Sequence, residues 1–395
     1  MKIALNAWFV GQPATGSGQY LAHLLAEYVA RHAQHRFLLC SPLSARAAAS
    51  PDPQAGLHRV PEQCPSPCEW RFLRTPFDGR HRHLAKLWFE QVSFPRACHR
   101  WGADVIHVPY WAAPLVARAP VVVTIHDLIP VLLPPYRAGI LGAAYTGLVS
   151  LSARRADLVL TDSRASQSDI IQHLRLAPDR VETIYLAADD RYHSERDPQV
   201  QERLRQEYAL PTRYLLYMGG FDVRKNVTGV VQAFAQVELP GVDLVVAGKL
   251  PLVDTPFAPD PRRVAQEMGI SGRVHFPGWI DEPDAPALYS GAIAFVFPSC
   301  YEGFGLPPLE AMACGTPVIV ANTGSLPEVV GDGGLCVDPQ DMAALSQAMG
   351  AVVLNGALRE QLSRAALARA RTFSWQQTAQ ATLDACHRAC EKQSP

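Results

Sequence analysis

The sequence predicts an α/β fold with two parallel sheets, one in each half of the chain. Short apolar runs rich in β-branched residues alternate with segments whose apolar residues recur about every 3.6 positions, which is typical of strands covered by helices on both faces. The 395 residues are too many for one ordinary core and suit two domains of similar size. Hydrophobic residues make up 48% of the chain and charged residues 18%, so each domain can bury a sizeable core.

The first half contains six apolar runs that predict strands, and the second half contains five. In the first half they cover 2–7, 37–40, 105–108, 121–125, 158–161 and 181–185, with clear helices over 18–33 and 163–174. In the second half they cover 214–218, 244–247, 274–276, 292–297 and 318–320. Ser163 is expected to be the N-cap of the helix that follows it.

A polar stretch that contains prolines, residues 189–211, separates the two halves and indicates a domain boundary near Asp190. We therefore predict an N-terminal domain over 1–190 and a C-terminal domain over 191–375. Residues 340–391 are expected to be almost continuous helix with one break near 373–375. The last segment, 376–395, could pack back on the N-terminal domain or form part of a terminal bundle.

Charge and cysteine content exclude several classes of protein. The net charge of −1 argues against a nucleic-acid partner. Nine cysteines without histidines at zinc-finger spacing indicate reduced thiols rather than a metal site or a disulfide framework. No run approaches 18 apolar residues, so we expect no transmembrane helix and a cytoplasmic location.

Residues 50–83 are rich in Pro, Arg and His and lack a clear period, so a long loop is expected there. Over 70–89, aromatic residues alternate with Arg and Lys. This mixture could bind an anionic lipid headgroup and hold the protein peripherally at the inner face of a membrane. The alternative is a solvated loop whose aromatic residues pack on their own domain.

The segment PSCYEGFGLPPLE, which ends at Glu310, follows a predicted strand and begins a helix. Its prolines mark a helix start, and the N–H groups of Gly303, Phe304 and Gly305 are left to face an anionic phosphate. Glu302 and Glu310 flank this turn, and carboxylates accept hydrogen bonds from sugar hydroxyls. In the alternative, Glu310 only complements the helix dipole and Glu302 is solvated.

A second segment, YMGGFDVRKN, runs from a strand through Gly219 and Gly220 into a helix. Arg224 and Lys225 lie where they could neutralise a diphosphate, and Asn226 is the expected N-cap. Both segments end strands of one predicted parallel sheet, and ligands bind at the carboxyl ends of such strands.

In the first half, Gly16 and Gly18 lie between the first strand and the first helix, as in a phosphate-binding turn. The spacing differs from a dinucleotide fingerprint and no acidic residue ends the second strand, so a dinucleotide cofactor is disfavoured. His126 follows the run 121–125 and could either reach a ligand or serve the core.

Taken together, EGFGLPPLE, GGFDVRKN, TIHDL, the GSG turn and GTPVIVANTGSLPEVVGDGG resemble the retaining glycosyltransferases of family 4, which have the GT-B fold. The resemblance covers residues 1 to about 385. It implies two Rossmann-like domains that face each other across a cleft, with a nucleotide-sugar donor in the C-terminal domain and the acceptor mostly against the N-terminal one.

By position, the resemblance implies that Glu302 contacts hydroxyls of the donor sugar and that Glu310 binds those of the ribose. Backbone N–H groups of Phe304, Gly305 and Leu306 would face the phosphate and the sugar.

The resemblance further implies that Lys225 and Arg224 bind the diphosphate and that His126 approaches the transferred sugar. Gly220 departs from the pattern, because many members have Arg there. The source of the second phosphate charge is therefore open, and Arg224 is the replacement candidate.

We expect a retaining hexosyltransferase in glycan biosynthesis that uses no protein nucleophile. The diphosphate leaves, and the hydroxyl of a saccharide or lipid-linked acceptor attacks from the same face; double displacement through Glu302 is the second mechanism. The form of the phosphate turn and the pair Glu90-Gln91 resemble bacterial mannosyltransferases that use GDP-mannose, while UDP-sugars stay open. Two different functions also fit the fold, namely a non-catalytic sugar-nucleotide-binding protein and a GT-B epimerase. Without an Asp-x-Asp motif in a phosphate-binding position, no cofactor or obligatory metal is expected.

Overall fold

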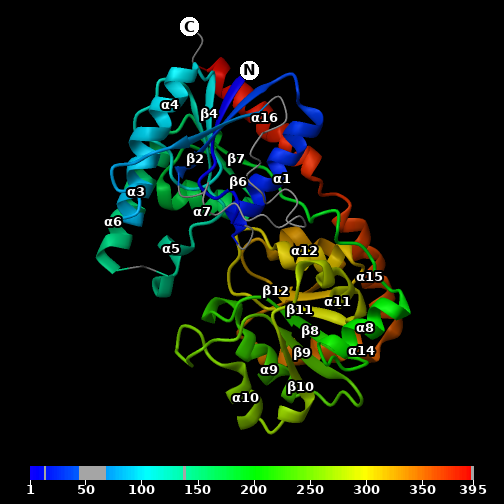
Figure 1. Ribbon diagram of the computed structural model, residues 1–395. Coiled ribbons are helices and arrows are strands. Elements are labelled where there is room, and N and C mark those ends of the chain that lie inside the picture. Colours follow the sequence, from blue (N-terminus) through cyan, green and yellow to red (C-terminus); the bar gives the residue numbers. More distant parts are fainter. Residues whose placement is uncertain (13–14, 44–67, 137–138, 393–395) are drawn as a thin grey trace. The chain divides into compact units, whose positions relative to one another are not determined.

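The computed structural model describes residues 1–12, 15–43, 68–136 and 139–392, and its chain divides into two compact units (Figure 1). Unit 1 consists of Met1–Leu186 together with Trp375–Pro395, and unit 2 of Ala187–Ser374. The division at Leu186 lies a few residues before the boundary predicted at Asp190.

Unit 1 is built on a seven-stranded parallel sheet with the order β3-β2-β1-β4-β5-β6-β7. Its strands are β1 (Lys2–Asn6), β2 (Arg36–Pro42), β3 (Cys68–Leu73), β4 (Val105–Val108), β5 (Val121–Thr124), β6 (Leu158–Thr161) and β7 (Val181–Thr183). Ile3 of β1 pairs with Phe37 on one side and with Val105 on the other. The strand order reverses at β1 and β4, the point where open parallel sheets bind ligands.

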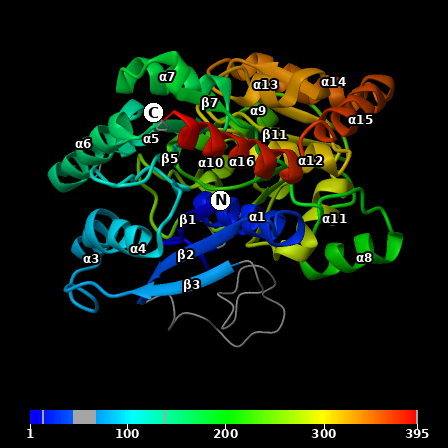
Figure 2. The same cartoon turned by 90° about the horizontal axis from the view of Figure 1, so that it is seen from above.

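The helices of unit 1 cover both faces of this sheet. They are α1 (Gly16–Arg31), α3 (Arg82–Trp88), the π-helix η2 (Phe89–Ser93), α4 (Phe94–Trp101), α5 (Ile129–Leu132), α6 (Gly139–Arg155), α7 (Arg164–Leu174) and α16 (Trp375–Glu391), with 3₁₀ turns at Pro134–Tyr136 and Pro178–Arg180. The α7 helix begins as predicted, because the Ser163 side chain accepts a hydrogen bond from the Ser166 N–H. The α16 helix packs against α1 (Figure 2).

Unit 2 is built on a six-stranded parallel sheet with the order β10-β9-β8-β11-β12-β13. Its strands are β8 (Tyr214–Met218), β9 (Asp243–Ala247), β10 (Val274–Gly278), β11 (Ala294–Phe297), β12 (Val318–Ala321) and β13 (Gly334–Val337). Its helices are α8 (Pro198–Glu207), α9 (Val227–Ala235), α10 (Pro261–Glu267), α11 (Ala285–Gly291), α12 (Leu306–Ala313), α13 (Leu326–Val330), α14 (Met342–Leu354) and α15 (Gly356–Ala370). Short 3₁₀ turns lie at Val223–Lys225, Ser271–Arg273, Glu282–Asp284 and Gly331–Gly333. The predicted pair of Rossmann-like parallel sheets is thereby confirmed.

The prediction of one loop over 50–83 is wrong in its second part. Cys68–Leu73 form β3, the edge strand beside β2, and Arg82–Trp88 form α3. Every residue of β3 is half-buried, so the strand lacks the apolar signature of the central strands. Residues 44–67 of the predicted loop lie outside the described residues.

The last helical segment has two breaks, although one was expected. The first break follows Leu354, where Asn355 adopts an extended backbone conformation and its side chain accepts a hydrogen bond from the Leu358 N–H at the start of α15. The second lies between α15 and α16, close to the predicted position. Among the described residues, no helix combines the length and apolar character that crossing a bilayer requires.

Candidate functional site

The carboxyl edge of the unit 2 sheet brings the two predicted phosphate-binding segments together. Strands β8 and β11 are hydrogen-bonded neighbours, so the turns that follow them meet. The Cys300 N–H donates to the Arg224 carbonyl at 2.8 Å, and the Arg224 guanidinium donates to the Tyr301 carbonyl at 2.6 Å. These bonds fix the two segments against each other.

Glu302 lies between the two predicted cations. Its Oε1 is 2.7 Å from the Lys225 ammonium and 2.7 Å from the Arg224 guanidinium, and all three side chains are largely buried. Burial opposes ionisation of the Glu302 carboxyl, but Lys225 and Arg224 outweigh it and hold its pKa below the usual range. The ammonium also lies 4.8 Å from the centre of the Phe297 ring.

This ion cluster of Glu302, Lys225 and Arg224 carries two positive charges against one negative charge. A diphosphate brought to it meets cations that are already in position but are engaged by a carboxylate. When such an anion binds, Lys225 and Arg224 must therefore contact the phosphates as well as Glu302, or instead of it. The Glu302 carboxylate can then accept hydrogen bonds from hydroxyls.

The turn before α12 is shaped by a glycine that other residues could not replace. Gly305 has φ of 110°, and a Cβ added there would lie 2.8 Å from the Leu326 side chain. The Ser325 hydroxyl donates to the carbonyls of Phe304 at 2.6 Å and Glu302 at 3.0 Å. Two prolines occupy the first turn of α12 and lack N–H groups, so Leu306 supplies the first helical donor.

Glu310 lies one turn into α12, and its carboxyl contacts phenols. The Tyr289 hydroxyl donates to Oε2 at 3.2 Å, and a Tyr192 hydrogen bond also favours ionisation of the carboxyl. Burial is the dominant influence and raises the pKa of Glu310 to about 7. Glu310 is thus half-ionised near neutral pH, whereas Glu302 is fully ionised.

At the carboxyl edge of the unit 1 sheet, His126 follows β5 and Asp162 follows the neighbouring strand β6. The His126 Nδ1 lies 2.7 Å from a carboxylate oxygen of Asp162. Burial lowers the pKa of His126, but the charge of Asp162 outweighs burial and raises it above its usual value. His126 is therefore part of an ion pair that the sequence interpretation missed.

Gly16 and Gly18 follow β1, as predicted, and α1 begins at Gly16 rather than at residue 18. Both lie in the first turn of α1, where the Thr15 side chain accepts a hydrogen bond from the Gly18 N–H. A Cβ at Gly18 would lie 2.2 Å from the Gln12 carbonyl oxygen, so a glycine is needed there for close packing of the preceding turn. At Gly16 an added Cβ would meet nothing within 4 Å.

Asn226 occupies the N-cap position of α9, as predicted, but its side chain makes no capping hydrogen bond. It donates instead to the Pro339 carbonyl at 2.9 Å. Its φ of 52° places it in the left-handed region, which Asn tolerates better than most residues. Asn226 therefore fastens the cation-bearing turn to the segment after β13.

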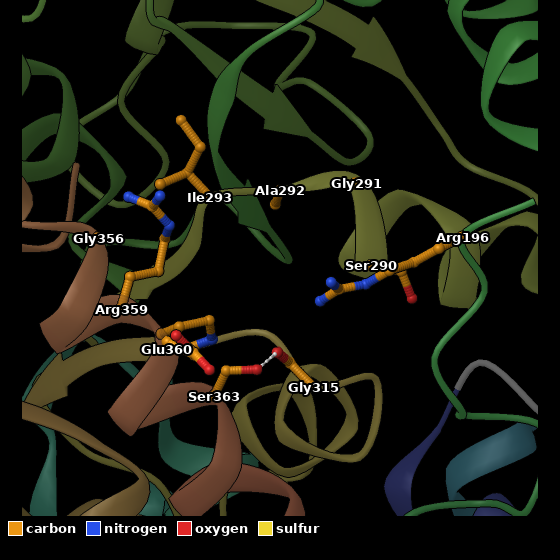
Figure 3. A pocket seen from close by; sticks show the side chains of 11 residues that line it. Arg196, Ser290, Gly291, Ala292, Ile293, Gly315, Gly356, Arg359, Glu360 and Ser363 are labelled. Atoms are coloured by element: carbon orange, nitrogen blue, oxygen red, sulfur yellow. Dashed lines mark hydrogen bonds between the residues drawn. The ribbon is translucent and has the colours of Figure 1, made fainter. Parts of the chain in front are cut away.

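The pocket drawn in Figure 3 lies at the opposite edge of the unit 2 sheet, before β11 and β12 begin. It has a volume of about 440 Å³, and Arg196 and Arg359 lie on either side of Ala292. None of the residues predicted for the donor site lines it.

Two family models match the chain, one on each half. The "Glycosyl transferase 4-like domain" model matches residues 15–187, and the "Glycosyl transferases group 1" model matches residues 200–369. The D-inositol 3-phosphate glycosyltransferase of Mycolicibacterium paratuberculosis is 31% identical over 418 aligned positions, which cover 98% of this chain and 89% of that protein. The chain belongs to the glycosyl transferases group 1 family.

Other relatives are similar to this group 1 chain over shorter stretches. The O-antigen chain mannosyltransferase B of Escherichia coli is 37% identical over 234 residues, which cover 58% of this chain and 60% of that protein. The serotype-specific mannosyltransferase WbdA of the same species is 31% identical over 58% of this chain, which spans only 28% of WbdA. The chain thus spans less than two thirds of the length of these mannosyltransferases.

The GT-B fold of this group 1 chain is confirmed by solved structures. Sucrose-phosphate synthase of Thermosynechococcus elongatus superposes with a TM-score of 0.73 over the full length of both chains, at 23% identity.

Several side chains at these sites belong to no motif that the sequence analysis identified. Asp162 directly follows the run 158–161, just as His126 follows 121–125, and this parallel was the only indication of their pairing. Tyr192 lies in the stretch interpreted as a domain boundary, and Tyr289 lies within α11, where nothing marks it as a partner of Glu310.

Proposed function

We propose that this protein is a retaining hexosyltransferase that moves mannose from GDP-mannose to a saccharide or lipid-linked acceptor in glycan biosynthesis. The observation that carries the proposal is the ion cluster of Glu302, Lys225 and Arg224 at the carboxyl edge of the unit 2 sheet. It supplies two cations for a diphosphate and one carboxylate for sugar hydroxyls. The likeness to the E. coli O-antigen mannosyltransferase supports mannose as the sugar.

In the proposed reaction the bond between sugar and diphosphate breaks first, and negative charge grows on the leaving diphosphate. Lys225, Arg224 and the N–H groups at the start of α12 stabilise that charge, because they are held in position before the reaction begins. The acceptor hydroxyl then attacks the oxocarbenium-like sugar from the face that the diphosphate left, so configuration is retained.

Two carboxyl groups of unit 2 and one imidazole of unit 1 have proposed roles toward the donor. Glu302 accepts hydrogen bonds from sugar hydroxyls, Glu310 binds those of the ribose, and His126 approaches the transferred sugar. The negative charge of Glu302 is already engaged by two cations, which favours this role over that of a nucleophile in a double displacement. No obligatory divalent metal takes part in the proposal.

The experiment is a donor panel with the full chain. GDP-mannose, UDP-glucose and UDP-galactose are each incubated with the protein, with and without a mannose-containing acceptor, and release of nucleoside diphosphate is measured. We expect release from GDP-mannose, and proton NMR of the product should show the anomeric configuration of the donor. The proposal fails if no nucleotide sugar is bound and the Glu302→Ala variant behaves as the wild type.

We further propose that unit 1 contacts an anionic membrane surface, although through a smaller set of residues than expected. The aromatic residues of 70–89 pack among themselves, since Trp70 stacks on Phe72 and Phe77 contacts Trp88. The longest exposed stretch is 79–84, where Arg80 and Arg82 accompany Leu84, which is 45% exposed.

Co-sedimentation with phosphatidylcholine vesicles that contain phosphatidylglycerol tests this contact. We expect binding that weakens with salt and is lost when Arg80 and Arg82 are both changed to Glu. Equal binding of that variant, or equal binding to vesicles without phosphatidylglycerol, would contradict the contact.

A further inference from the structure

The His126 ring is fixed from several sides at the carboxyl edge of unit 1. Asp162 holds Nδ1 at 2.7 Å, and its own side chain is 4% exposed. The Ser166 hydroxyl donates to the His126 carbonyl at 3.1 Å, which fixes the backbone. The Tyr20 ring of α1 contacts the imidazole edge-on, with ring centres 5.0 Å apart. A side chain held in this way has little freedom to change its orientation.

The charges around this ring show that Asp162 is its principal ionic partner. His107 on β4 faces it, but burial, with the charge of His126 adding to it, lowers the pKa of His107 to about 3, so His107 is neutral. Burial raises the pKa of Tyr20 as well, so its phenol is uncharged. Asp127 next along the chain and the Pro109 backbone favour the charged ring, but both contribute less than Asp162.

The opposite ring nitrogen, Nε2, is buried and makes no hydrogen bond of acceptable geometry to the described residues, although the Pro109 backbone lies close enough to favour the charged ring. A buried ring nitrogen without a well-formed hydrogen bond is uncommon. The His126 side chain is 20% exposed, so the ring meets its surroundings through atoms other than this nitrogen.

We infer that Asp162 is a positioning residue, which accepts the Nδ1–H of His126 and keeps the ring protonated and in a fixed orientation toward bound substrate. The inference rests on the proposed function for the identity of that substrate, the transferred sugar. Without the carboxylate, burial would favour a neutral ring, and neutral imidazole can carry its proton on either nitrogen. An amide in its place can itself donate to Nδ1 and force the wrong tautomer.

The test is the Asp162→Asn variant of the full chain, studied by NMR with ¹⁵N-labelled histidine. In the wild type, we expect the His126 signals to show both nitrogens protonated and to titrate above the usual histidine range. In Asp162→Asn, the ring should titrate below that range and be neutral at pH 7. The kcat for transfer should fall about tenfold to a hundredfold, with a smaller change in the donor KM because the residues proposed to hold the nucleotide and the diphosphate are unchanged.

Asp243→Asn is the matched control. Asp243 also holds a histidine, His275, at 2.8 Å, but this pair joins β9 to the edge strand β10 and lies outside the proposed site. We expect its kcat to equal that of the wild type. If Asp162→Asn folds poorly, Asp162→Glu provides a second measurement, because it keeps a carboxylate and should preserve the charged ring.

An unchanged His126 titration in Asp162→Asn would overturn the inference, as would an equal loss of kcat in Asp243→Asn. The NMR result does not depend on turnover. If the wild type transfers no sugar from any donor, the proposed function fails, while the titration still decides whether Asp162 sets the charge and tautomer of His126.

Discussion

Glu302→Gln removes the single negative charge of the ion cluster and keeps the shape of the side chain. Both contacts measure 2.7 Å, and the three side chains are 11–14% exposed. At an effective dielectric constant of about 20, each contact attracts with on the order of 6 kcal/mol before desolvation is subtracted. The change leaves Lys225 without its carboxylate, whereas Arg224 keeps a longer contact of 3.6 Å with Asp222. Removing the partner of a buried cation typically costs about 3–5 kcal/mol, so we expect the free energy of unfolding to fall by about 3 kcal/mol.

Two measurements follow from this figure. Thermal unfolding should show the Tm of unit 2 lowered by about 6–12 °C. Isothermal titration should show GDP binding about tenfold more tightly than to the wild type, because the diphosphate no longer competes with a carboxylate. Sugar transfer should nevertheless fall by a factor on the order of 10²–10³, because a neutral amide accepts hydrogen bonds from sugar hydroxyls more weakly than a carboxylate does.

The pH dependence of stability gives an internal check. The pKa of Glu302 is lower in the folded than in the unfolded state, so its stabilising contribution is present above the unfolded pKa and is lost as pH falls through the folded one. The difference between variant and wild type should therefore shrink below about pH 4.

Glu360→Gln is the matched control for this variant. Glu360 also pairs with an arginine, Arg364, at 3.1 Å, but both side chains are about 70% exposed. We expect less than about 0.5 kcal/mol of change and the GDP affinity of the wild type. If Glu302→Gln were as stable as the wild type and bound GDP equally, the competition between carboxylate and diphosphate would be refuted.

Three further predictions concern other parts of the donor site. Gly248→Ala should lower the free energy of unfolding, measured in urea titrations, by about 2 kcal/mol or more. The reason is that Gly248 has φ of +133° and the new Cβ would lie 2.3 Å from the Gly219 carbonyl. The control is Gly241→Ala, which has φ of +68° and open space around the new Cβ, and it should cost about 1 kcal/mol. The GDP affinity should rise between pH 6 and 8 as Glu310, with a pKa of about 7, ionises and accepts the ribose hydroxyls, and Glu310→Gln should show a flat profile. Because the folded state binds that proton more tightly than the unfolded state, Glu310 also becomes destabilising as pH rises through this range, so the Gln variant should be the more stable one at pH 8. Turnover should persist in excess EDTA, and a complete loss that added metal reverses would contradict the absence of an obligatory metal.

The central strands were predictable from the sequence, and two edge strands were not. The run 121–125 consists of β-branched residues and is apolar except at Thr124, because β5 is buried on both faces. In contrast, β3 is half-buried throughout, and β13 is half-buried or exposed at each position. An edge strand that is partly exposed to water needs no apolar run, so a search for apolar runs does not detect it.

The candidate site was predictable where a charged side chain lies next to a recognisable turn in the sequence. Lys225 follows a strand and a glycine turn, Glu302 follows a strand and directly precedes a glycine turn, and the parallel sheet brings the two turns together. The partners of His126 and Glu310 could not be predicted in this way. Asp162 and Tyr192 reach them through the tertiary fold, and burial, which sets the pKa of Glu310, is a property of the packed unit rather than of any short segment.

The placement of α16 has a consequence for the order in which the protein is made. Unit 1 contains the first 186 residues and the last helix, whose Trp375, Ala379 and Leu383 are buried in it. The Thr378 hydroxyl also donates to the Tyr185 carbonyl at 2.6 Å. During synthesis on the ribosome, unit 2 can therefore complete its core before unit 1 does, although unit 1 emerges first. A chain that stopped before Trp375 would leave the core of unit 1 incomplete. Any exchange of unit 1 between relatives must also transfer two separate stretches of the gene together.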